Sequence, residues 1–158
     1  AISPELKQLA SEGKIFTRAH DKNILFSLKL EELVDTDIQQ IQSTASLREV
    51  IELIKTGNKN LIAVINNQQQ FEGIILVDDI RPILFEPELY DTVTVKKIMQ
   101  RPPAIVGLKE NINQVIKKFD AVQVWTLPVV QDKKLIGFIS KSSILNKYRS
   151  LLQEYSES

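Results

Sequence analysis

The chain of 158 residues contains no cysteine and a single histidine, His20. The absence of cysteine excludes disulfides, zinc–thiolate sites and thiol nucleophiles. A zinc site on His20 would need carboxylates alone as its other protein ligands, so His20 is interpreted as a solvated surface residue. A Ser–His–acid triad would have to use His20, and no serine lies in a Gly-x-Ser-x-Gly context. The composition therefore supplies no recognisable set of catalytic residues, and the chain is not predicted to be an enzyme.

Net charge and long apolar runs are lacking as well. Lysine plus arginine and aspartate plus glutamate both number 20, which leaves no excess positive charge for nucleic acid. The apolar runs are short, as at 74–77, and predict no insertion into a membrane. The five glycines form neither a Walker A loop nor a dinucleotide-binding fingerprint.

An internal repeat becomes visible when the chain is shifted by 65 residues. Ser46 and Glu49 form a capping-box pattern, and the shift places Asn111 and Gln114 at the equivalent positions. Apolar residues at the spacing of an amphipathic helix follow each cap. These are Leu47, Val50, Ile51 and Ile54 in the first copy and Ile112, Val115, Ile116 and Phe119 in the second.

Two short apolar runs, 62–65 and 127–130, follow these helices and have strand character. The polar turn after the second run is one residue shorter, so the shift becomes 64 for the next pair of strands, 71–75 and 135–139. Two strands joined by a tight polar turn predict an antiparallel hairpin. A final helix is expected to begin near Asp78 or Asp79 in the first copy and near Ser142 or Ser143 in the second. Each copy thus reads strand, helix, strand, strand, helix.

The fold class predicted is α+β, with two repeats packed as a pseudo-twofold pair because neither copy alone has enough core. Ser3, Pro4, Leu6, Leu9 and Gly13 predict a short helix in the lead-in. The predicted organisation is a lead-in at 1–27, a first repeat at 28–84, a linker at 85–94, a second repeat at 95–149 and a helical extension at 150–158.

The order of elements over 28–149, with Leu-Pro-Val-Val at 127–130 and Gly-Phe-Ile-Ser at 137–140, resembles a tandem pair of CBS domains, or Bateman module. A narrower set of short sequence segments is similar to the C-terminal cytosolic region of bacterial CLC-type chloride channels and transporters. These segments are 9–13, 20–25, 33–37, Trp125, and Tyr148 with Arg149. This resemblance implies a regulatory and dimerising module on the cytoplasmic face of the membrane, whose partner is the parent's membrane domain. The alternative is an adenine-nucleotide-sensing CBS pair that regulates an unrelated transporter or enzyme.

The CBS resemblance implies no required cofactor, with an adenine nucleotide as the optional ligand. The family signature is Gly, two apolar residues, Ser or Thr, two free positions and Asp. The carboxylate can accept hydrogen bonds from the ribose hydroxyls, while the hydroxyl and the helix N-terminus meet a phosphate. This sequence divides the signature: the first copy keeps Asp79 but has Leu76 for the hydroxyl, and the second keeps Ser140 but has Ser143 for the carboxylate. The candidate ligand residues are Asp79, Ser140, Lys141 and Ser143.

A simpler interpretation assigns these residues to helix starts. Asp78 and Asp79 then stabilise the positive N-terminal end of the helix dipole, and Ser142 and Ser143 are N-caps. Lys141 is interpreted either as a lysine that attracts phosphate or as an ordinary exposed lysine. Trp125 precedes a buried strand and is predicted to lie in a core or an interface.

The last helix carries more apolar residues than a terminal helix packed on one side requires. Tyr148 and Leu152 are therefore candidates for a homodimer contact. The alternative is that they close the core of their own chain.

Overall fold

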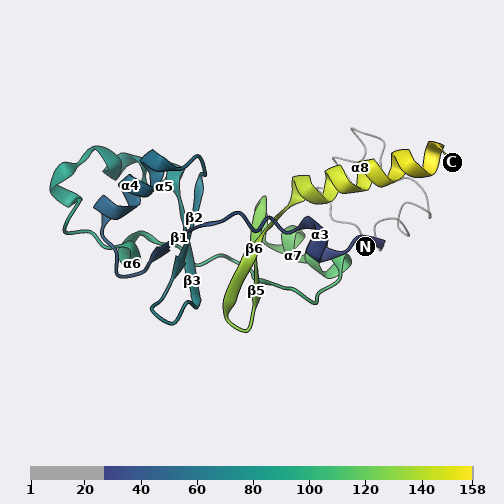
Figure 1. Cartoon of the computed structure of the whole chain (residues 1–158), viewed down its shortest axis with the longest axis horizontal. Helices are drawn as coiled ribbons and strands as arrows, with labels where there is room; N and C mark the ends of the chain where they lie inside the picture. The colour runs from purple at the N-terminus through teal and green to yellow at the C-terminus, as the bar shows by residue number, and fades with distance from the viewer. Residues whose placement is uncertain (1–26, 158) are drawn as a thin grey trace. The chain divides into compact units, whose positions relative to one another are not determined.

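The computed structural model describes residues 27–157, which form two compact units (Figure 1). We call residues 37–102 with 132–135 the first-sheet unit, and the described residues 27–36, 103–131 and 136–157 the second-sheet unit. The helix predicted around Pro4 and the position of His20 lie outside the described residues.

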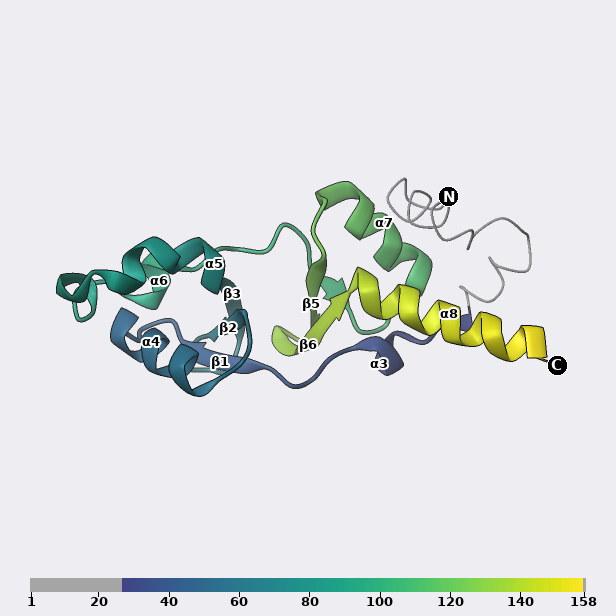
Figure 2. The same ribbon diagram turned by 90° about the horizontal axis from the view of Figure 1, so that it is seen from above.

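The first-sheet unit contains a three-stranded sheet in the order β1 (Gln39–Gln42), β2 (Leu61–Ile65) and β3 (Phe71–Leu76). β1 runs parallel to β2, and β3 runs antiparallel to it, as the hairpin pattern predicts. α4 (Leu47–Thr56) and α5 (Val77–Ile80) cover one face of this sheet (Figures 1 and 2). Because β2 is central and covered, its residues 62–65 are all buried.

The segment after α5 completes the core of this unit. It forms the 3₁₀ helices η1 (Arg81–Phe85) and η2 (Pro87–Leu89), each with a proline in its first turn, and then α6 (Val95–Ile98). Val95 is fully buried, and its N–H donates to the carbonyl of Ala45 at 2.8 Å. The stretch 85–94, predicted as a linker, therefore includes η2 and packs Leu89 and Tyr90 against the core.

The second-sheet unit contains β4 (Val106–Gly107), β5 (Thr126–Gln131) and β6 (Lys134–Ser140) in that order, with the first two strands parallel. β5 and β6 are joined by Asp132 and Lys133, whose φ values of 51° and 66° are those of a type I′ hairpin turn. The other elements are α3 (Leu30–Leu33), α7 (Ile112–Val122) and α8 (Lys141–Glu157). α7 and α8 lie on one face of the strands (Figures 1 and 2).

The segment before the first strand of each sequence repeat, which we call the lead-in of that repeat, joins the sheet of the other repeat. In the second-sheet unit Asp35 pairs with Phe138, and in the first-sheet unit Gln100 pairs with Ile74. The two pairs are equivalent under the shifts of 65 and 64 residues. The compact units thus differ from the sequence repeats, because each unit takes its lead-in from the other copy.

The predicted α+β class, with two repeated three-stranded sheets, is confirmed. Both predicted capping boxes are present, at Ser46 with Glu49 and at Asn111 with Gln114. The last helix of each repeat starts one or two residues earlier than predicted, at Val77 and at Lys141. None of the helices within residues 27–157 is long and apolar enough to cross a membrane.

Candidate functional site

Each repeat has the same backbone arrangement where its last helix begins. The N–H of Val77 donates to the carbonyl of Asn60 at 2.9 Å, and the N–H of Lys141 donates to the carbonyl of Trp125 at 3.0 Å. These bonds anchor the start of the last helix to the residue before the hairpin. We call Asn60, Asp79 and Gln100 the first half-site, and Trp125, Ser140, Lys141 and Ser143 the second half-site.

In the first half-site the signature carboxylate already has a partner. Asp79 is exposed and accepts a hydrogen bond from Nε2 of Gln100 at 2.5 Å, while its neighbour Asp78 pairs with Arg81. Leu76 occupies the N-cap of α5 and makes no side-chain capping bond. Gln100 was not among the predicted site residues, since only the exchange of lead-ins brings it to Asp79.

In the second half-site the serines cap α8. The hydroxyl of Ser140 accepts from the N–H of Ser143 at 3.1 Å, and the hydroxyl of Ser143 donates to the carbonyl of Ser140 at 2.8 Å. The hydroxyls of Ser140 and Ser142 lie 3.1 Å apart. The N-cap is therefore Ser140, and the assignment of Ser142 or Ser143 to this position is corrected, because the helix starts at Lys141.

Lys141 is not the exposed lysine that the sequence suggested. Its side chain is buried, with 3% of the residue exposed, and its Nζ lies 4.9 Å from the ring centre of Trp125 and 6.0 Å from that of Phe119. Burial lowers the pKa of Lys141 below its ordinary value of 10.5. Both rings stabilise the ammonium by cation–π interaction, which offsets part of the cost of burying it.

Trp125 is 63% exposed, so it lies neither in the core nor against a covering element of the described chain. Of the two predicted positions, core or interface, the core position was wrong, because Trp125 precedes the first residue of β5, Thr126, and the buried residues of that strand begin only at Leu127. The result is a large flat aromatic group beside the serine-capped start of a 17-residue helix. Such a group can stack on a planar ligand, and a helix N-terminus can meet an anion.

The two candidates for a dimer contact, Tyr148 and Leu152, belong to the second-sheet unit. Tyr148 is fully buried in the core of the second-sheet unit, and Leu152 packs partly buried against the same core. The side chain of Tyr148 thus closes its own core, which was the alternative considered for it, and is not available to a partner.

Across the part of the chain that the structure describes, no three His, Asp or Glu side chains are grouped to hold a metal ion.

The family model for the CBS domain matches residues 30–86 and again residues 95–150. The chain belongs to the CBS domain family. The tandem CBS pair is a regulatory module, and the resemblance drawn from the repeat is confirmed.

Solved structures with the same fold have low sequence identity to this CBS pair. CbpB in complex with c-di-AMP is 18% identical, with a TM-score of 0.71 over 88% of this chain and 96% of that one. The CBS domain of a CBS domain-containing membrane protein from Sphaerobacter thermophilus is 14% identical, with a TM-score of 0.68 over 87% and 96%.

The curated relatives are homoserine O-acetyltransferases of two methanogens. The protein of Methanosphaera stadtmanae is 24% identical over 80% of this chain and 25% of its own length. The protein of Methanococcus vannielii is 22% identical over 74% and 24%. The CBS pair therefore spans about a quarter of the length of these relatives. None of the proteins named here supports the narrower resemblance to CLC channels.

Proposed function

We propose that this CBS pair is a regulatory module that binds one adenine nucleotide per chain at the second half-site. The observation that carries the proposal is the exposed indole of Trp125 beside the serine-capped N-terminus of α8. The adenine base stacks on the indole, and the phosphates meet the hydroxyls and the positive end of the helix dipole.

The buried ammonium of Lys141 has a positioning role in this proposal. It lies 4.9 Å from the centre of the Trp125 ring and holds the indole by cation–π attraction, and it is not presented to phosphate. The indole is therefore fixed before the ligand arrives, which lowers the entropic cost of binding.

The first half-site is the weaker candidate for the same ligand. Asn60 stands where Trp125 stands in the other repeat, so this position offers no aromatic ring to the base. Asp79 would have to exchange its bond from Gln100 for bonds from a ribose. That CbpB, which has the same fold, was crystallised with c-di-AMP supports adenine nucleotides as the ligand class to test.

Trp125 is the only tryptophan in the chain, so its fluorescence reports on the second half-site alone. We expect ATP, ADP or AMP to quench it in a saturable titration. Ser143→Asp restores the missing carboxylate, and aspartate at this helix position can still accept from the N-cap N–H. It should tighten binding by about tenfold, because a hydrogen bond to a charged group contributes about 1.5–3 kcal/mol.

Asp79→Asn is the matched control, since it removes the carboxylate of the other half-site. It should leave the quenching curve unchanged. A Ser143→Asp variant that binds no better than the wild type, or an Asp79→Asn variant that stops binding, would reject the second half-site as the nucleotide site.

A second candidate concerns what the module is attached to. The sequence of residues 33–37 and the earlier lead-in favour the C-terminal region of a CLC-type chloride channel or transporter, on the cytoplasmic face of the membrane, in a homodimer that involves Leu152. This assignment is tested by the coding sequence upstream of Ala1. It requires several segments of about 20 apolar residues each. An upstream acyltransferase sequence, as in the methanogen relatives, would instead make the CBS pair a regulator of that enzyme.

A further inference from the structure

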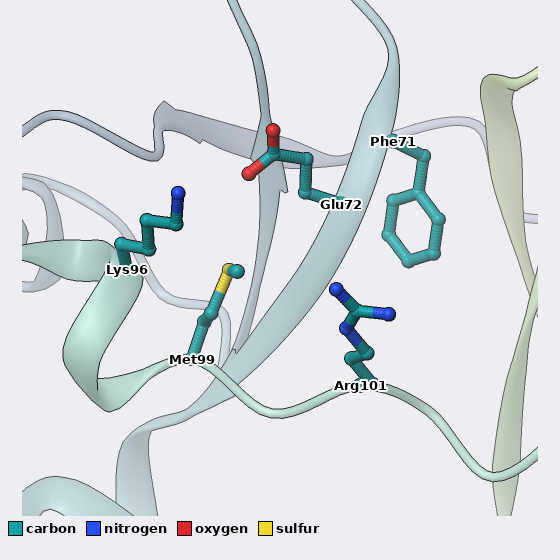
Figure 3. A pocket seen from close by; sticks show the side chains of 5 residues that line it. All are labelled: Phe71, Glu72, Lys96, Met99 and Arg101. Atoms are coloured by element: carbon teal, nitrogen blue, oxygen red, sulfur yellow. The ribbon is translucent and has the colours of Figure 1, made fainter.

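A cavity lies within the first-sheet unit, and its lining shares no residue with either half-site, although Met99 and Arg101 flank Gln100 of the first half-site in the sequence. Its volume is about 270 Å³, and five side chains line it: Phe71, Glu72, Lys96, Met99 and Arg101 (Figure 3). Phe71 and Glu72 begin β3, and the other three come from α6 and the residues after it. The exchange of lead-ins therefore builds this cavity, because it brings the segment 96–101 to the edge of β3.

The charged side chains of the cavity have no partner in the described part of the chain. The carboxylate of Glu72, the ammonium of Lys96 and the guanidinium of Arg101 make no hydrogen bond or ion pair with another described residue, and Lys96 and Arg101 are exposed. Figure 3 shows Glu72 directed to the side of Lys96, and the guanidinium of Arg101 beside the ring of Phe71. Two cations and one carboxylate thus border a space with two apolar walls and are open to a ligand.

The second-sheet unit provides an internal comparison. The repeat shifts place Glu31 at the position of Lys96, Thr36 at that of Arg101 and Ile136 at that of Glu72. The same backbone pairing is present in both units. The fold therefore forms without these three charges, and their presence in one unit only is not a requirement of the architecture.

We propose that this cavity binds a free α-amino acid with an apolar side chain. Arg101 and Lys96 bind the carboxylate, Glu72 binds the ammonium, and Phe71 and Met99 contact the side chain. A volume of about 270 Å³ is below the roughly 300–1,000 Å³ of pockets for drug-sized ligands, which fits a small metabolite. The site is independent of the nucleotide half-site, because the two share no residue.

The proposal is tested by thermal-shift and calorimetric titration of the full chain with methionine, leucine and phenylalanine, each at up to 10 mM. At least one of them should bind saturably. Its N-acetyl and amide derivatives, which lack one charge each, should bind at least about tenfold more weakly, since each loses a hydrogen-bonded charge pair. Sodium phosphate and sodium acetate should not reproduce the effect.

Arg101→Thr and Glu72→Gln should each weaken amino acid binding by at least about tenfold. Arg101→Thr introduces the residue that the other repeat carries, so the fold is expected to tolerate it. Lys97→Gln, at an exposed neighbour outside the cavity, is the control and should bind as the wild type does. Thermal unfolding of all three variants without ligand should match that of the wild type, which shows that they are folded, and nucleotide quenching of Trp125 should be unchanged.

Three results would overturn this inference: no amino acid binding at 10 mM, equal binding of phosphate or acetate, or amino acid binding that survives both cavity variants. None of these results would bear on the nucleotide site, because Trp125 fluorescence measures that site separately.

Discussion

Two glycines lie where the backbone of a lead-in passes closest to the edge strand of a sheet. A Cβ on Gly73 would lie 2.7 Å from the carbonyl oxygen of Gln100, and a Cβ on Gly137 would come closer still to the carbonyl oxygen of Asp35. Both glycines have negative φ, so their backbone conformation does not require glycine. Glycine is required because the two backbones leave no space for a Cβ. The signature glycine is therefore needed for the lead-in to pair with the strand.

Gly137→Ala and Gly73→Ala should both destabilise the chain, and Gly137→Ala should do so more. The expected cost is about 1–3 kcal/mol, the usual range for overpacking, because a backbone carbonyl has to move. Urea denaturation followed by circular dichroism measures both. Equal stability of Gly137→Ala and the wild type would show that the lead-in pairing is loose.

The buried Lys141 makes the free energy of unfolding depend on pH. Its pKa in the folded chain is lowered by burial, so the unfolded chain binds the proton more tightly than the folded chain. The free-energy cost of burying the charged ammonium of Lys141 is complete at neutral pH. It disappears as the pH rises from the lowered pKa to the ordinary value of 10.5.

Lys141→Met keeps a long apolar side chain and removes this titration. The difference in unfolding free energy between wild type and variant should shift in favour of the wild type as the pH rises from 8 toward 10.5. Taking the difference cancels the other lysines and tyrosines. A difference that stays constant over this range would contradict the lowered pKa.

At the scale of the elements, α4 and α7 both begin with reciprocal caps. Ser46 accepts from the N–H of Glu49 at 3.4 Å, and Asn111 accepts from the N–H of Gln114 at 2.9 Å. In return, the side-chain oxygen of Glu49 accepts from the N–H of Ser46 at 2.8 Å, and that of Gln114 accepts from the N–H of Asn111 at 2.9 Å. Each box satisfies donors that the helix itself leaves unpaired.

Ser46→Ala and Asn111→Ala should each lower the free energy of unfolding by about 1 kcal/mol. Ser150→Ala, at an exposed position inside α8, is the control and should change it by less than about 0.5 kcal/mol. Thermal and urea midpoints give both values. A cap variant that behaves like Ser150→Ala would mean that tertiary packing alone sets the start of that helix.

These elements were predictable because their signals are local. The stripe from Leu47 and the stripe from Ile112 repeat at the helical period, and the hairpins follow from short apolar runs around polar turns. The half-sites were predictable only in part. Ser140 and Asp79 follow from the signature, whereas Gln100, the burial of Lys141 and the exposure of Trp125 depend on contacts between residues far apart in the sequence.

At the scale of the whole molecule, the sequence repeat and the folding unit differ. The core of the first-sheet unit includes Val95, whose α6 belongs to the second repeat by sequence. A fragment cut at the sequence repeat loses this helix and its hydrogen bonds to Ser43 and Ala45.

A fragment of residues 37–102 should therefore unfold cooperatively on heating, and a fragment of residues 28–86 should not. The reason is that the shorter piece leaves the buried surface around Leu47 and Val50 uncovered. Circular dichroism against temperature compares them. A cooperative transition of 28–86 at a higher temperature than that of 37–102 would show that the sequence repeat is the folding unit.

The nucleotide site is tested most directly by calorimetric titration of the wild-type chain and of Trp125→Ala with ATP, ADP and AMP. We predict that the wild-type chain binds one adenine nucleotide in the micromolar range. Binding to Trp125→Ala should be weaker by about tenfold, since stacking on an aromatic side chain contributes about 1–3 kcal/mol per base. At 100 times its dissociation constant, the nucleotide should also add about 2.7 kcal/mol of stability. No heat up to millimolar nucleotide, or full binding by Trp125→Ala, would contradict this prediction.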